Sequence, residues 1–181
     1  LAKSNVSNAP SEAENLLHEM HHLYNAGDKH VKPNVVTYGA VIDTYAKSGQ
    51  KGSAARADAL LADMIRLHQS DPITHTDLAP NTYSFNTVIN AWAKSGEYNA
   101  ANKAEEILQA MEDLYHSSGS RDLRPDTFTY TAVIDAWAKS GIQGAALRAN
   151  ALLRKMEDLY NSGRNRALKP NTYTYNGATT S

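Results

Sequence analysis

The sequence predicts an all-α fold, a solenoid of stacked antiparallel helix-turn-helix repeats. One segment recurs with small changes, as PNVVTYGAVIDTYAKSG, PNTYSFNTVINAWAKSG, PDTFTYTAVIDAWAKSG and the partial copy PNTYTYNGATTS. The opening prolines Pro33, Pro80, Pro125 and Pro170 are 45 to 47 residues apart, a period typical of stacked repeats. Units of this kind bury their apolar faces against their neighbours and present an extended binding surface.

The first helix of each repeat follows the opening proline. In the first copy, apolar residues stand at i, i+3, i+4, i+7 and i+8, which places them on one face of a helix. The aligned sets are Tyr38, Val41, Ile42, Tyr45, Ala46; Phe85, Val88, Ile89, Trp92, Ala93; and Tyr130, Val133, Ile134, Trp137, Ala138. Each set ends in Lys-Ser-Gly, so we expect Gly49, Gly96 and Gly141 to adopt the left-handed conformation that stops a helix.

The second helix of each repeat is equally regular. Its apolar face is Ala57, Leu60, Leu61, Met64, Leu67, then Ala104, Ile107, Leu108, Met111, Leu114, then Ala149, Leu152, Leu153, Met156, Leu159. The same pattern at the N-terminus comprises Ala13, Leu16, Leu17, Met20 and Leu23. Variation in repeat length falls after the methionine, in segments rich in Ser, Asp, Gly and Pro, which predicts surface loops.

These patterns divide the chain into parts of one solenoid domain. Residues 1–32 hold the second helix and loop of a truncated repeat, and residues 170–181 begin another. Three whole repeats lie between them, at 33–79, 80–124 and 125–169. The chain starts at Leu1 and stops inside a repeat, so we expect it to be a fragment of a larger protein.

Composition limits the possible functions. The chain has 18 basic and 19 acidic residues and no cysteine, which excludes a disulfide framework, a thiolate nucleophile and a Cys-ligated zinc site. No apolar run approaches the roughly 20 residues that span a bilayer, so we expect no membrane partner.

The chain resembles the pentatricopeptide repeat family. The resemblance rests on the Pro-Asn/Asp step, the Thr-Tyr or Ser-Phe-Asn opening of the first helix, the VID/VIN core, the Ala-Lys-Ser-Gly stop and the Leu-Leu-x-x-Met second helix, and it extends from about Pro10 onward. The usual repeat of this family has ~35 residues, close to the ~34 of tetratricopeptide repeats. The repeats of this chain are longer, at 45 to 47 residues. The resemblance implies a right-handed solenoid that binds single-stranded RNA, one base per repeat, without cofactor, metal or catalysis of its own.

The resemblance also implies which residues contact bases. One contact to a base comes from the residue after the first-helix aromatic. The second contact to the same base comes from the residue after the opening proline of the next repeat. The first set is Gly39, Asn86, Thr131 and Asn176, and the second is Asn34, Asn81, Asp126 and Asn171, with Asn34 belonging to the truncated first repeat. Asn86 with Asp126 resembles a uracil-binding pair and Thr131 with Asn171 an adenine-binding pair. Gly39 with Asn81 matches no strong pairing, so the expected ligand contains 5′-N-U-A-3′.

Two further sets of positions fit an RNA-binding face. The base-flanking residues are Val36, Tyr83, Phe128 and Tyr173, where the family more often has aliphatic side chains and where an aromatic ring could stack on a base. The phosphate-proximal residues are Lys47, Lys94 and Lys139. Each lysine shares a helix face with the base-contacting residue eight positions earlier, because the intervening spacings are four residues.

Structural roles explain the same residues without RNA. Asn34, Asn81, Asp126 and Asn171 stand where a helix needs an N-cap. The three lysines would complement helix C-terminal dipoles, and Asp43 and Asp135 would pair with two of them. The aromatic residues at the base-flanking positions could instead pack between repeats.

One motif suggests different chemistry. His18-Glu19-Met20-His21-His22 matches H-E-x-x-H, in which two histidines bind zinc and the glutamate is a general base. The aligned positions in the other copies carry unrelated residues, and no third ligand follows. We therefore expect no metal site.

Three hypotheses follow. The chain is an RNA-binding solenoid acting in RNA processing, stability or translation in a mitochondrion or plastid, as the family resemblance implies. Alternatively, it is a helical-repeat scaffold for a protein or peptide partner. The third hypothesis is a metalloprotease built on His18, Glu19 and His22.

Overall fold

The computed structural model describes residues 8–179. Of the predicted parts of the solenoid, only residues 1–7, Thr180 and Ser181 lie outside this range. Every regular element in this range is a helix, which confirms the predicted all-α class. The chain divides into two compact units, one ending at Pro80 and the other beginning at Asn81.

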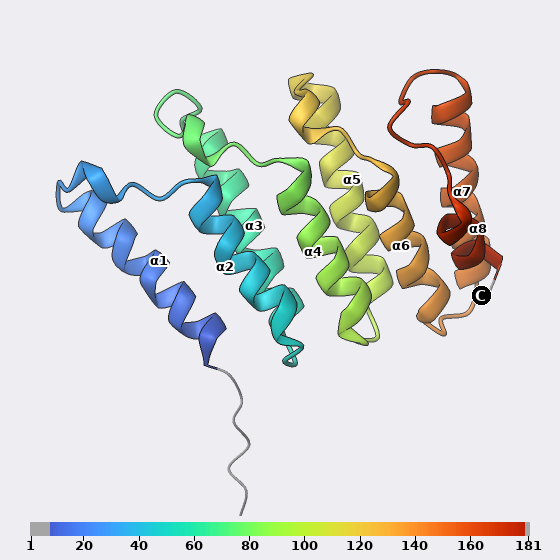
Figure 1. Cartoon of the computed structure of the whole chain (residues 1–181), viewed down its shortest axis with the longest axis horizontal. Helices are drawn as coiled ribbons and strands as arrows, with labels where there is room; N and C mark the ends of the chain where they lie inside the picture. The colour runs from blue at the N-terminus through green and yellow to red at the C-terminus, as the bar shows by residue number, and fades with distance from the viewer. Residues whose placement is uncertain (1–7, 180–181) are drawn as a thin grey trace, which may run out of the picture. The chain divides into compact units, whose positions relative to one another are not determined.

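The first unit contains three α-helices and two 3-10 turns. They are α1 (Ala9–Asn25), η1 (Lys29–Val31), α2 (Val35–Ser48), α3 (Ser53–Ser70) and η2 (Thr76–Leu78). Helix α2 packs against both α1 and α3 (Figure 1).

The second unit contains five α-helices and one 3-10 turn. They are α4 (Thr82–Ser95), α5 (Ala100–Ser118), η3 (Arg121–Leu123), α6 (Thr127–Lys139), α7 (Ala145–Asn161) and α8 (Thr172–Thr179). Helix α6 is central, because it packs against α4, α5, α7 and α8. The first helices of successive repeats, α4, α6 and α8, thus form one layer, while α5 and α7 cover its other side (Figure 1).

Apolar periodicity accounts for the core of each unit. Ile42 and Met64 are fully buried in the first unit, as are Ile89, Met111 and Met156 in the second. The predicted stop glycines are confirmed, since Gly49, Gly96 and Gly141 have φ angles of 63°, 66° and 64°. A left-handed backbone of this kind ends a helix at low cost only in glycine.

The predicted apolar face of α1 is only partly buried. Leu17 is 2% exposed, but Leu16 and Leu23 are 62% and 39% exposed. Within residues 8–80, α1 packs on α2, η1 and the Arg56 side chain of α3, and these leave one side of the helix uncovered. The spacing placed all five residues on one face, but a neighbouring helix is needed to bury the whole of it.

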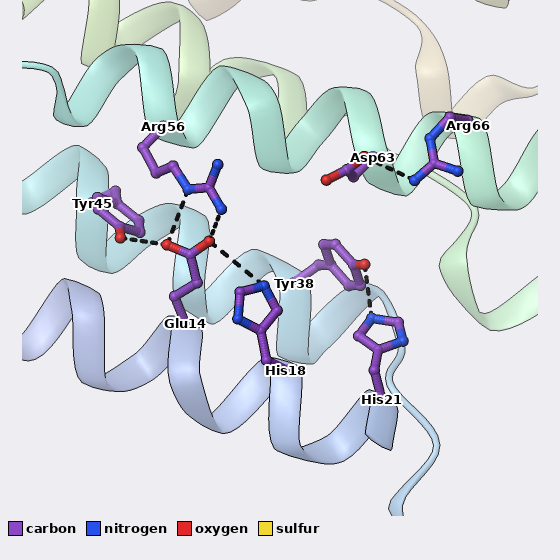
Figure 2. A network of polar contacts seen from close by, with 8 residues as sticks. All are labelled: Glu14, His18, His21, Tyr38, Tyr45, Arg56, Asp63 and Arg66. Atoms are coloured by element: carbon purple, nitrogen blue, oxygen red, sulfur yellow. Dashed lines mark hydrogen bonds and ion pairs between the residues drawn. The ribbon is translucent and has the colours of Figure 1, made fainter. Parts of the chain in front are cut away.

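A carboxylate clamp joins three helices in the first unit. The buried Glu14 of α1 accepts hydrogen bonds from the Tyr45 hydroxyl of α2 at 2.5 Å and from Arg56 Nε of α3 at 3.0 Å (Figure 2). The Arg56 guanidinium holds the pKa of Glu14 below its ordinary value. A charged carboxylate is stable at a buried position when it is paired and hydrogen-bonded in this way.

The second unit repeats the carboxylate clamp. Glu105 of α5 accepts from Trp137 Nε1 of α6 at 2.7 Å and from Arg148 Nε of α7 at 2.9 Å. Glu105 occupies the repeat position of Glu14, one residue after the conserved alanine of the second helix. The clamp therefore joins α1 to the α2–α3 hairpin in the first unit, and it joins the α4–α5 hairpin to the α6–α7 hairpin in the second.

Candidate nucleic-acid interface

The first helices begin at side-chain caps. The side-chain oxygens of Asn34, Asn81, Asp126 and Asn171 accept from the backbone amide three residues later, at 2.9 to 3.1 Å. A hydroxyl residue stands at each of those third positions: Thr37, Ser84, Thr129 and Thr174. The structure thus shows the capping role that we considered for these four residues, each stabilising its helix by about 1 kcal/mol.

Asn86 and Asp126 lie in direct contact within the second unit. Asn86 Nδ2 is 3.3 Å from Asp126 Oδ1, although the two residues belong to consecutive repeats. The Thr129 hydroxyl lies 2.7 Å from Asn86 Oδ1 and 2.9 Å from Asp126 Oδ1. These contacts fix which end of the Asn86 amide faces the carboxylate.

Thr131 and Asn171 are brought together through a third residue. The Thr131 hydroxyl is 3.0 Å from the Thr174 hydroxyl, which in turn lies 3.1 Å from Asn171 Oδ1. Thr129 and Thr174 occupy the same repeat position, so a hydroxyl joins each pair. Both hydroxyls stand three residues after a helix cap, but their contact with the preceding repeat appears only in the structure.

An open groove of about 760 Å³ lies over the second of these pairs. Thr131 and Asn171 line it together with Asn176, the aromatic rings of Phe128 and Tyr173, and polar residues of α4 and α6. The groove therefore combines hydrogen-bonding groups with two aromatic rings, as a site for a planar polar ligand requires.

The base-flanking positions are exposed. Val36, Tyr83, Phe128 and Tyr173 are 73%, 59%, 52% and 79% exposed. In each unit these side chains therefore leave most of their surface open to solvent, which does not favour a role in packing between repeats. Exposed aromatic residues at repeated positions are suited to stacking on ligand rings.

Two of the three predicted phosphate-proximal lysines have carboxylate neighbours. Lys47 Nζ is 2.6 Å from Asp43 and Lys139 Nζ is 2.7 Å from Asp135, each one helical turn apart. Lys94 is exposed near the end of α4, where the residue one turn earlier is the neutral Asn90. Surface pairs of this kind contribute little to stability, but they reduce the local positive charge.

The remaining predicted pair is divided between the units. Gly39 lies in α2 of the first unit, and Asn81 caps α4 of the second. Gly39 is buried, yet beyond its chain neighbours and the backbone of its own helix no heavy atom lies within 4 Å of the place where a Cβ would stand. Its lack of a side chain is therefore not imposed by crowding.

The histidine motif lies on α1. His18 Nε2 is 3.9 Å from the carboxylate of Glu14, and His21 Nε2 is 2.9 Å from the Tyr38 hydroxyl (Figure 2). In residues 8–179 no three His, Cys, Asp or Glu side chains are grouped so that they could hold a metal ion. Over the same residues no helix is both long and apolar enough to span a membrane.

The family model described as "PPR repeat" matches residues 83–115, which cover most of α4 and α5. The match includes Asn86 and the exposed Tyr83. Repeats of this family bind RNA in a general sense and are typically non-catalytic. No curated protein matches the chain.

Proposed function

We propose that this pentatricopeptide repeat protein binds single-stranded RNA with base specificity, one base per repeat. The observation that supports it best is the contact of Asn86 with Asp126, two residues 40 positions apart that the family pattern pairs. Contact between them lets one base meet both side chains.

Asn86 and Asp126 are suited to uracil. An amide nitrogen carries two hydrogens, and the Asp126 carboxylate takes one of them. The second can donate to a carbonyl oxygen on the edge of the base. Uracil presents a carbonyl oxygen where cytosine presents an amine, by analogy with thymine and cytosine in DNA, so a fixed donor distinguishes the two.

Thr131 and Asn171 are suited to adenine in the adjacent groove. The Thr131 hydroxyl and the Asn171 amide offer both hydrogen-bond donors and acceptors. They can therefore bind the edge of adenine, which carries one donor and one acceptor. Phe128 and Tyr173 line the same groove, and a base between them would stack on exposed aromatic surface. Stacking contributes about 1 to 3 kcal/mol per base with little dependence on its identity.

The order of these pairs gives the expected element 5′-N-U-A-3′, with uracil contacted by α4 and adenine by α6. Such a protein would act in RNA processing, stability or translation in a mitochondrion or plastid. It would act by occupying RNA, without catalysing a reaction.

Competition binding tests this function. Fluorescent single-stranded RNAs of equal length would carry UA or CC at one central step, and their affinities for the full chain would be compared. We expect tighter binding of the UA oligonucleotide. Asn86→Ala and Thr131→Ala should each reduce that preference, while Asn102→Ala, on the exposed side of α5, should leave it unchanged.

Two outcomes would count against the proposal. Equal affinity for UA and CC with no effect of either substitution would exclude base recognition by these pairs. The scaffold alternative would be favoured if no oligonucleotide bound at low salt while a peptide did bind, and if substitution of Phe128 or Tyr173 weakened that peptide binding.

A further inference from the structure

We infer that two anchored loops of the second unit form a basic edge that contacts the phosphates of the bound RNA. The basic edge consists of Arg121 and Arg124 in the loop before α6, and Arg166 and Lys169 in the loop before α8. This inference rests on the proposed function and adds a second surface to it. The same loops hold part of the extra length of these repeats.

The loop before α8 is fixed against the start of α6. Buried Asn165 donates from Nδ2 to the Pro125 carbonyl at 2.8 Å, and Leu168 is fully buried. On the other side of Asp126, the Thr127 amide and hydroxyl donate to the Ala167 carbonyl at 3.0 and 2.9 Å. Both neighbours of the base-contacting Asp126 therefore bind this loop.

Burial alternates along the same loop. Arg166 and Lys169 are exposed, whereas Asn165 and Leu168, which precede them, are buried. Anchoring by the buried residues directs the two cations to solvent from a backbone that is held in place. Arg164 is not part of the basic edge, because it lines a pocket beside α7.

The loop before α6 is fixed in the same way. The Thr82 hydroxyl, adjacent to the cap Asn81, lies 2.8 Å from the Asp122 carbonyl and 3.2 Å from the Arg124 carbonyl. Leu123, which lies between these two residues in the sequence, is buried. Arg121 is exposed and Arg124 partly so, and Asp122 is the one acidic residue of this loop.

The cations of the basic edge differ from the helix lysines in their surroundings. Within residues 8–179, none of the four forms an ion pair, whereas Lys139 pairs with Asp135. In the first unit the cation before the opening proline Pro33 is compensated, because Lys32 pairs with Asp77 of the loop after α3 at 2.9 Å. Uncompensated positive charge in the second unit thus gathers next to the base-contacting residues.

Phosphate is the ligand that this arrangement favours. Guanidinium groups bind phosphate oxygens in a bidentate manner, and a lysine adds a point charge. A single strand whose bases reach Asp126 and Asn171 would have its backbone close to the start of α6 and α8. Contacts there would raise affinity without selecting bases.

Salt-dependent binding of the full chain tests the basic edge. The variant Arg166→Gln/Lys169→Gln removes two cations, and Lys51→Gln/Arg154→Gln removes two exposed cations elsewhere as the matched control. We expect the loop variant to bind the UA and CC oligonucleotides more weakly by the same factor. Its slope of log affinity against log salt should be shallower by about 1.4, or about 0.7 for each phosphate contact of a single strand.

Oligonucleotides with uncharged methylphosphonate linkages flanking the UA step complete the test. They should bind wild type more weakly than ordinary RNA does, and the loss should be smaller for the loop variant, which keeps only Arg121 and Arg124 of the basic edge. If the loop variant matches the control in affinity and slope while Asn86→Ala still alters preference, the basic edge is wrong and base recognition stands. If wild type binds no RNA, both fail.

Discussion

The hydroxyl of Tyr130 donates a hydrogen bond to the carboxylate of Glu112, and Lys155 Nζ lies 2.6 Å from the other oxygen of the same group. Tyr130 and Glu112 are 0% and 6% exposed. Burial, reinforced by the neighbouring carboxylate, raises the pKa of Tyr130. The three residues come from α5, α6 and α7, so this contact joins consecutive hairpins of the second unit.

The same two repeat positions are matched elsewhere in the chain. Where the first-helix aromatic residue has a hydroxyl, that hydroxyl is hydrogen-bonded to the aligned residue of the preceding helix. His21 Nε2 lies 2.9 Å from the Tyr38 hydroxyl, and Glu157 accepts a hydrogen bond from the Tyr175 hydroxyl at 2.8 Å. In the remaining copy the sequence has Phe85 and Ile65 at these positions, both apolar. Polarity at one position therefore changes together with polarity at the other.

Replacing Glu112 and Tyr130 with the apolar pair tests this matching. Glu112→Ile alone leaves the buried hydroxyl without an acceptor and should cost about 1 to 3 kcal/mol. Glu112→Ile/Tyr130→Phe should recover most of that loss, because a buried polar pair can often be replaced by well-packed apolar residues. Urea unfolding followed by tryptophan fluorescence reports on the second unit, which holds both Trp92 and Trp137.

If the double variant lost as much stability as the two single substitutions together, the two positions would not be energetically matched. Lys155→Gln is the control for the partly exposed cation, and we expect it to cost less than Glu112→Ile, because the Lys155 side chain is 45% exposed.

The matched and clamped pairs also show what the sequence could and could not predict. Helical spacing and the stop glycines were sufficient for the helices, because both act within about ten residues. Glu105 and Trp137 are 32 positions apart, so their contact depends on how hairpins stack. Asn165 anchors an irregular loop, which has no period to identify it. The Asn86 and Asp126 pair was predicted only through the family resemblance.

Alkaline pH should destabilise the first unit through Tyr38. Burial raises its pKa to about 12, from an ordinary value of about 10. Between these values the unfolded chain loses the phenolic proton while the folded chain keeps it, so this contribution to stability is present below pH 10 and is lost as the pH rises toward 12. We expect Tyr38→Phe to flatten the fall in stability over this interval.

Far-UV circular dichroism during urea unfolding at several pH values measures that effect. Tyr45 and Tyr130, whose pKa values are also raised by burial and by neighbouring carboxylates, leave a residual slope in the variant. An unchanged pH dependence in Tyr38→Phe would mean that Tyr38 does not titrate differently in the folded and unfolded chains.

Two helical glycines should respond oppositely to alanine. A Cβ at Gly39 would meet no atom within 4 Å, so Gly39→Ala should stabilise the first unit by about 0.5 to 1 kcal/mol. A Cβ at Gly177 would lie 3.1 Å from Cγ2 of the fully buried Ile134, and Gly177→Ala should therefore give no gain or a loss. Thermal unfolding midpoints compare the two, and equal gains would contradict the difference in packing.

Asp126→Asn separates capping from base contact. Asparagine caps a helix about as well as aspartate, so the stability of the second unit should change by less than about 0.5 kcal/mol. The amide at position 126 no longer offers a charged acceptor to Asn86 Nδ2, whose orientation in the structure depends on that contact. We therefore expect the preference for UA over CA oligonucleotides to fall while the helix remains intact. Asn102→Ala, on the exposed side of α5, is the control and should not alter the preference. If Asp126→Asn preserves both stability and preference, Asp126 is a helix cap alone and the uracil assignment fails.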